Sequence, residues 1–207
     1  INNWLMLHGD GVRDICFEVD DVDACYQEAV KRGARSAQAP RDLADANGRV
    51  RHAAIHTYGD VVHSFISLDD YNGPFLPGYQ EKEEIEEPVG LLSIDHIVGN
   101  VEEGNMDRWK NWYAQVLGFD QFVSFDEKKS QIQEYLDVNY APGVQHVAIT
   151  TDDIIYTVSR LRERGIEFLG TPASYYEGLA ERVGNIDESI DALKPLGILV
   201  DRDEHGY

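Results

Sequence analysis

The chain has 207 residues, of which 43% are hydrophobic, with 11 Tyr and 3 Trp, so it can bury a core in one large domain or two of ordinary size. Its formal net charge is −20, from 18 basic and 38 acidic residues. A surface this acidic repels nucleic-acid phosphates and anionic membranes, which excludes nucleic acid as a partner and requires a local positive centre for any anionic substrate.

The first half of the chain is predicted to contain strands and one helix. Its expected elements are, in order, a strand over residues 14–19, a helix from an Asp20 or Asp21 cap to Arg32, and strands over residues 53–58 and 61–68. Gly59-Asp60 lies between the last two strands and indicates a hairpin. Residues 81–88, EKEEIEEP, have no apolar periodicity and are interpreted as a solvated linker.

The second half repeats the alternation of strands and helices. Its expected elements are strands over residues 92–98, 119–125, 144–150 and 198–200, helices over residues 106–117 and 153–164, a helical turn over residues 131–136, and short helices over residues 175–179 and 188–193. Trp109 and Trp112 mark the apolar face of the first helix and are expected in the core. The pattern predicts an α+β protein in which helices cover one side of curved, mostly antiparallel sheets.

One motif occurs twice. Residues 11–33 read GVRDICFEVDDVDACYQEAVKRG and residues 143–165 read GVQHVAITTDDIIYTVSRLRERG, and they align without a gap at an offset of 132 with six identities. A repeat of this kind indicates a duplicated supersecondary unit. His146 in the second copy corresponds to Asp14 in the first. A strand histidine in one copy only is a candidate metal ligand, with the other copy as its structural twin.

Other reactive side chains receive structural interpretations. Cys16 and Cys25 lack the spacing of a zinc or redox motif and are expected to be buried thiols. Asp20-Asp21 and Asp152-Asp153 precede helices and are expected to be caps rather than catalytic carboxylates. His52, His56 and His63 cluster at the predicted hairpin and are interpreted as structural or surface histidines, with a residual metal site as the alternative. Without a membrane-length apolar run or a recognisable signal peptide, a cytoplasmic location is expected.

His96 and His146 each lie in an alternating apolar strand. If the two strands pair, their imidazoles can converge on one point. Two histidines and one carboxylate on one face of an octahedron form the site of non-haem Fe(II) oxygenases. From the spacing alone, hydrogen-bonded core histidines are the favoured interpretation, and the metal site is the alternative.

Several segments resemble the 4-hydroxyphenylpyruvate dioxygenase family. They are YNGPFLPGY in the first half, followed in order by SIDHIVGNVEEGNMDRWKNWYAQVLGF, KSQIQEYL, APGVQHVAITTDDI, LRERGIEFL, TPASYY and LGILVDRDEHGY. The likeness runs from about Gly11 to Tyr207. It implies tandem βαβββ modules of the vicinal oxygen chelate type, with a metal-free N-terminal domain and a catalytic C-terminal domain.

The resemblance also implies an activity and a site. The activity is the Fe(II)-dependent conversion of 4-hydroxyphenylpyruvate and O2 to homogentisate and CO2, in tyrosine and phenylalanine catabolism. The family's first two iron ligands fall on His96 and His146, and its active-site glutamines, which bind substrate, fall on Gln131 and Gln145. A homo-oligomer without nucleic-acid or membrane partners is expected. The alternatives are a 4-hydroxymandelate synthase, a glyoxalase-type lyase or isomerase, and a non-catalytic binding protein on the same fold.

The chain departs from the family pattern in ways that define its expected domains. The third ligand, a glutamate, is expected beyond Tyr207, and the chain is shorter than the family near Glu127 to Lys129. We therefore expect a partial N-terminal module without a metal site over residues 1–80, an acidic linker over residues 81–93, and an incomplete catalytic domain over residues 94–207. The favoured explanation is that this sequence gives parts of a longer protein, and a truncated, inactive relative is the alternative.

Overall fold

The computed structural model of the chain describes residues 2–82, 87–121 and 129–202. Packing divides the chain into two compact units. One comprises Ile1–Glu83 and His96–Val147, and the other comprises Glu84–Asp95 and Ala148–Tyr207. Each unit consists of two separate segments of the chain, so the units do not test the domain boundaries predicted at residues 80 and 93.

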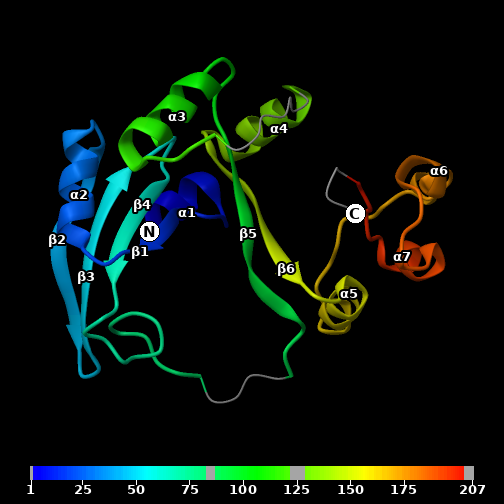
Figure 1. Cartoon of the computed structure of the whole chain (residues 1–207), viewed down its shortest axis with the longest axis horizontal. Helices are drawn as coiled ribbons and strands as arrows, with labels where there is room; N and C mark the ends of the chain where they lie inside the picture. Colours follow the sequence, from blue (N-terminus) through cyan, green and yellow to red (C-terminus); the bar gives the residue numbers. More distant parts are fainter. Residues whose placement is uncertain (1, 83–86, 122–128, 203–207) are drawn as a thin grey trace. The chain divides into compact units, whose positions relative to one another are not determined.

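The first unit contains a complete βαβββ module (Figure 1). Its elements are β1 (Asp14–Glu18), α2 (Val22–Lys31), β2 (Arg35–Asp45), β3 (Gly48–His56) and β4 (Val62–Ser67). They form one sheet in the order β1-β4-β3-β2, in which β1 and β4 run parallel and the other neighbours run antiparallel. The resemblance implied βαβββ modules; of these five elements, the sequence pattern predicted β1, α2, β3 and β4 but not β2.

The core of this module lies between α2 and one face of the sheet. Val22 and Ala29 of α2 pack with Ala53, Ile55 and Phe65 of the strands, and all five are at most 4% exposed. Alternation along the strands places these side chains on one face of the sheet. A helix this short is only marginally stable by itself, so burial of its apolar stripe against the sheet stabilises α2.

Further elements complete the first unit. They are α1 (Asn2–His8), α3 (Met106–Trp112), the π-helix η1 (Tyr113–Leu117), α4 (Lys129–Asn139), and the adjoining parts of β5 (Leu91–Asn100) and β6 (Gly143–Thr151). A second core joins Tyr58 and Val61 to Val144, and Trp109 and Tyr113 pack against it. Trp112 packs against the first core. Both tryptophans are therefore partly buried and pack against a core, which supports the prediction.

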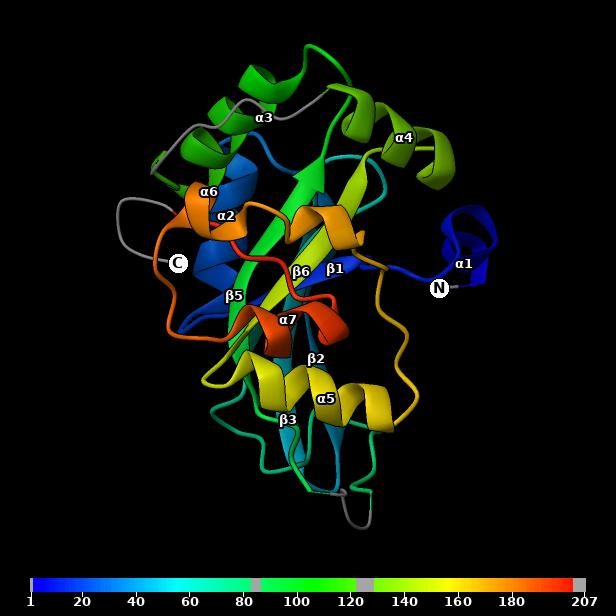
Figure 2. The ribbon, with the colours of Figure 1, turned by 90° about the vertical axis from the view of Figure 1, so that its right-hand side faces the viewer.

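The second unit is mainly helical. Its helices are α5 (Ile154–Glu163), the 3-10 helix η2 (Ala173–Tyr175), α6 (Leu179–Val183) and α7 (Ile190–Leu196), and α5 and α7 lie side by side (Figure 2). Leu179, Val183 and Leu193 are at most 2% exposed and form its core with Tyr176. Within the described part of this unit, the only strand segments are Leu91–Asp95 and Ala148–Thr151, the adjoining ends of β5 and β6.

The two copies of the repeated motif fold alike around their helix caps. The Asp21 carboxylate accepts a hydrogen bond from the Ala24 N–H at 2.9 Å, and the Asp153 carboxylate accepts one from the Tyr156 N–H at 2.8 Å. Both caps have extended backbones, with φ/ψ of −135°/98° and −143°/93°. The predicted role of the aspartate pairs as caps is confirmed.

Four expectations about elements were wrong. The sequence analysis missed α1, α6 and the long strand β2, whose register shifts twice against β3 and whose residues show no regular alternation of apolar side chains. Residues 198–200 do not form a strand. Instead the hydroxyl of Tyr175 donates to the Val200 carbonyl and accepts from the Val200 N–H, at 2.7 and 2.8 Å, and Tyr176 donates to the Ile198 carbonyl.

Two further expectations need correction or fall partly outside the described chain. The two cysteines are not the fully buried thiols that were expected, since Cys16 is exposed and Cys25 is half-buried. Cys16 is exposed because its side chain lies on the face of β1 that points away from the core. Of the strand predicted over residues 119–125, residues 119–121 have no regular structure and the rest lie outside the described residues. Within the described chain, every helix is too short or too polar to cross a bilayer.

Candidate metal centre and adjoining pocket

The structure brings His96 and His146 together. His96 lies in β5 and His146 in β6, which are neighbours in a two-stranded sheet. Their Nε2 atoms are 3.4 Å apart, and their ring centroids are 5.5 Å apart with an interplanar angle of 78°. Both histidines are exposed.

Gln145 contacts His146 directly. Its Oε1 lies 3.0 Å from His146 Nδ1, whereas the other ring nitrogen, Nε2, faces His96. Gln131, the other predicted glutamine, lies in the first turns of α4, and its side chain is outside what the structure describes. The structure therefore places one of the two glutamines beside the histidine pair.

The histidine pair has the separation that a shared metal ion needs. Two nitrogens bound to one ion at about 2.1 Å are about 3.0 Å apart at an octahedral angle and about 3.4 Å apart at a tetrahedral one. The measured 3.4 Å falls in this range. Among the residues that the structure describes, no group of three or more histidine, cysteine, aspartate or glutamate side chains could hold a metal ion. The pair could supply two nitrogen donors of the predicted set.

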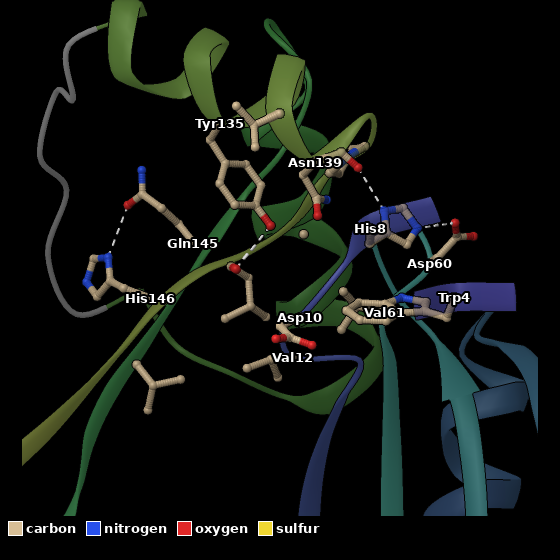
Figure 3. A pocket seen from close by; sticks show the side chains of 16 residues that line it. Trp4, His8, Asp10, Val12, Asp60, Val61, Tyr135, Asn139, Gln145 and His146 are labelled. Carbon is tan, nitrogen blue, oxygen red and sulfur yellow. Dashed lines mark hydrogen bonds and ion pairs between the residues drawn. The ribbon is translucent and has the colours of Figure 1, made fainter. Parts of the chain in front are cut away.

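A pocket of about 360 Å³ adjoins Gln145 and His146 (Figure 3). It is lined by α1 residues including Trp4 and His8, by the segment that leads into β1, by Asp60 and Val61 before β4, by α4 residues including Tyr135, and by the start of β6. The sequence analysis did not predict this pocket. No local sequence signal was available, because its walls come from segments far apart in the chain.

Hydrogen bonds fix the walls of the pocket. His8 is held at both ring nitrogens, with Nδ1 2.7 Å from the Asn139 carbonyl and Nε2 2.9 Å from the Asp60 carboxylate. The Tyr135 hydroxyl donates to the Val144 carbonyl at 3.0 Å. Partial burial raises the pKa of Tyr135 above its usual value, so its hydroxyl remains a donor at neutral pH. A Cβ at Gly143 would collide with this hydroxyl, so any larger residue there would have to displace Tyr135.

His52, His56 and His63 lie on or beside the hairpin of β3 and β4. His63 is 1% exposed, and its ring contacts the Ile15 carbonyl through Nδ1 at 3.1 Å and the Tyr113 hydroxyl through Nε2 at 2.8 Å. His52 and His56 lie on β3, and burial lowers the pKa of each. The hydrogen bonds of His63 support the structural interpretation for that residue, whereas for His52 and His56 it stays a prediction.

Comparisons with known proteins place the chain in a family. Residues 128–206 match the model of the Glyoxalase/Bleomycin resistance protein/Dioxygenase superfamily. The chain is 39% identical to 4-hydroxyphenylpyruvate dioxygenase of Tetrahymena thermophila over 251 residues, which cover all of this chain and 62% of the relative. It is 40% identical to the enzyme of that name from Dictyostelium discoideum, over 98% of this chain and 67% of the relative.

These alignments are longer than the chain itself. The chain spans about three fifths to two thirds of the length of the curated relatives that it matches. The alignment with the Tetrahymena protein covers 251 positions and the whole of a 207-residue chain, so the relative has residues within the aligned span that this chain lacks. A shortened interior, as expected from the sequence, accounts for part of the difference in length.

Solved structures agree on the fold. A triple mutant of 4-hydroxymandelate synthase from Streptomyces coelicolor superimposes with a TM-score of 0.75 at 25% identity, covering 98% of this chain and 66% of that one. A Mn(II)-bound glyoxalase from Novosphingobium aromaticivorans superimposes with a TM-score of 0.51 at 18% identity, over 77% of this chain and 54% of that one. The chain has the βαβββ module and the paired histidines, and it is 40% identical to a curated relative of which it covers 67%. It therefore belongs to the 4-hydroxyphenylpyruvate dioxygenase family.

Proposed function

We propose that the full-length protein is an Fe(II)-dependent 4-hydroxyphenylpyruvate dioxygenase, which converts 4-hydroxyphenylpyruvate and O2 to homogentisate and CO2. The observation that carries the proposal is the convergence of His96 and His146, with Nε2 atoms 3.4 Å apart, in a chain of this family. The two histidines occupy the positions that the family resemblance implies for iron ligands.

His96 and His146 would hold the metal through Nε2, and a glutamate beyond Tyr207 would supply the carboxylate. Two imidazoles and one carboxylate leave three open positions on a ferrous ion. When bound, the iron would supply a Lewis acid that takes the α-keto acid group of the substrate and a redox centre that activates O2. It would also give the positive centre that an anionic substrate needs against a net charge of −20.

Gln131 and Gln145 would bind and orient the substrate. A neutral amide can donate and accept hydrogen bonds without adding charge beside a metal ion. Amide donors held in place can also stabilise the oxygen charge that develops as carbon dioxide leaves and the ring is oxygenated. Gln145 lies on the wall of the pocket and beside His146, which supports this role.

The test is a product assay on the full-length protein with Fe(II), ascorbate, O2 and 4-hydroxyphenylpyruvate. Products are resolved by chromatography or NMR, because homogentisate and 4-hydroxymandelate are isomers that mass alone does not separate. Homogentisate is the expected product. Absence of oxygen uptake by iron-loaded protein would contradict an oxygenase and favour a binding protein on the same fold.

A 4-hydroxymandelate synthase is the second candidate. It is favoured by the structural likeness to that enzyme from Streptomyces coelicolor over nearly the whole chain. The identities of 37–40% to proteins named 4-hydroxyphenylpyruvate dioxygenase favour the first candidate. The same assay decides, since 4-hydroxymandelate as the product would keep the site and change the enzyme. A homo-oligomeric state and a cytoplasmic location stay predictions.

A further inference from the structure

We propose that Gln145 is a positioning residue, which fixes the tautomer and the orientation of the His146 imidazole. This inference rests on the proposed function and deepens it, because it assigns to one side of the Gln145 amide a task other than substrate binding. The observation is the 3.0 Å contact between Gln145 Oε1 and His146 Nδ1 (Figure 3).

The contact is unusual for neighbours in a strand. Successive side chains along a β-strand leave the backbone toward opposite faces, so residues next to each other in sequence seldom touch. Gln145 and His146 both lie within β6, and the longer Gln145 chain must turn toward the imidazole for the contact to form. An ordered contact of this kind constrains the rotation of both side chains.

The chemistry of the amide decides which imidazole nitrogen carries the proton. The Oε1 atom of a glutamine only accepts hydrogen bonds, so His146 Nδ1 must carry the donated proton. In the neutral ring, Nε2 then keeps its lone pair. That atom is the one that lies 3.4 Å from His96 Nε2, where the metal is proposed to bind. Gln145 therefore presents the correct nitrogen of His146 to the metal.

The same bond divides the Gln145 amide between two tasks. Its oxygen contacts His146, and its NH2 group keeps two donors for a substrate oxygen. We expect Gln145 to act on the substrate as a donor only. Partners that orient metal-bound histidines are commonly carboxylates, backbone carbonyls or waters, and their removal costs about 10- to 100-fold in metal affinity or activity.

The experiment compares three variants of the full-length protein. Q145M keeps the length of the side chain and removes the strong acceptor, whereas Q145E keeps an acceptor and removes the amide donors. Q80L is the matched control, because Gln80 is an exposed glutamine outside any helix or strand. Far-UV circular dichroism and thermal melting establish that each variant is folded.

Two readouts do not depend on turnover. The first is titration of the metal-free protein with Co(II), followed by its visible absorption. The second is 15N NMR of the histidine side chains, which reports which ring nitrogen of His146 carries the proton. We expect Q145M to bind Co(II) about tenfold or more weakly than wild type and to lose the preference for a proton on Nδ1. We expect Q145E and Q80L to retain that tautomer and tight binding.

Kinetics separate orientation of the histidine from contact with the substrate. Iron-loaded Q145E should retain metal but show a raised KM for 4-hydroxyphenylpyruvate, because it has no amide donor for the substrate. A wild-type His146 that carries its proton on Nε2, or a folded Q145M that binds Co(II) as tightly as Q80L, would overturn the inference. A wild type that shows the expected tautomer and Co(II) affinity, but forms no homogentisate with iron, would support the positioning role and reject the proposed function.

Discussion

The Asp14 carboxylate accepts hydrogen bonds from both the backbone N–H and the hydroxyl of Ser64, at 3.0 and 2.5 Å. Asp14 is the residue that corresponds to His146 in the repeated motif. In the first copy this position fastens β1 to β4, whereas in the second copy it carries a candidate metal ligand. One position of a duplicated motif thus has a structural use in one copy and a proposed chemical use in the other.

Asp14→Ala should destabilise the protein by about 1–3 kcal/mol, because it leaves the buried polar groups of Ser64 without their acceptor. Ser64 is 2% exposed, so water cannot readily replace the carboxylate. Urea unfolding midpoints measure the change. Asp14→Asn, which keeps one acceptor oxygen, should lose less, and equal losses in both variants would contradict this explanation.

Removal of either candidate metal ligand should abolish iron retention and turnover in the full-length protein. His96→Ala and His146→Ala each leave a single imidazole of the pair. Iron per protein after desalting, measured by mass spectrometry, and homogentisate formation are the readouts. His56→Ala on β3 is the control and should retain iron. Undiminished iron and activity in His146→Ala would refute the assigned site.

The two helix caps should contribute similar stability in the two copies of the motif. Asp21→Ala and Asp153→Ala each remove a side-chain acceptor from a helix N-terminus and should cost about 1 kcal/mol, within a range of about 0.5–2 kcal/mol. Asp20→Ala and Asp152→Ala are the matched controls, because these residues lie one position before the N-cap of each helix. The prediction fails if a control costs as much as its neighbouring cap in chemical denaturation.

Tyr113→Phe should destabilise the first unit through the buried groups that it leaves unpaired. The Tyr113 hydroxyl lies 2.8 Å from His63 Nε2 and 3.1 Å from Thr57 Oγ1, and both partners are at most 6% exposed. The expected loss is about 1–3 kcal/mol in the free energy of unfolding. Tyr79→Phe, at a side chain that is 57% exposed, makes the same chemical change and should be neutral.

Stability should decrease as the pH falls below the ordinary histidine range. Burial lowers the pKa of His63 in the folded state, so between that lowered pKa and about 6.5 the unfolded chain binds more protons. The stability is therefore fully present above about pH 6.5 and is lost progressively below it. Denaturation midpoints at about pH 7.5 and about pH 5 measure the loss, in a window above the ordinary carboxylate range. His63→Gln should show a smaller loss, and an unchanged loss would exclude His63 as the source.

The sequence determined those features that depend on local patterns. Alternating apolar residues located β1, β5 and β6, and a capping aspartate before an apolar stripe located α2 and α5. The repeat between residues 11–33 and 143–165 predicted two equivalent caps, which the structure confirms. These signals survive in sequence because helix caps and strand alternation involve residues only a few positions apart.

Tertiary structure decided everything that depends on contacts between distant segments. The spacing of His96 and His146 left open whether their imidazoles converge, since strand pairing rather than sequence separation sets the distance between them. The strand β2 lacks a regular apolar pattern and exists through its pairing with β3, so local signals missed it. The chain at Ile198 and Val200 is held by tyrosine hydroxyls instead of a neighbouring strand. The contact between Gln145 and His146, from which the His146 tautomer is inferred, also depends on tertiary structure. Strand alternation by itself would have placed these two side chains on opposite faces of the sheet.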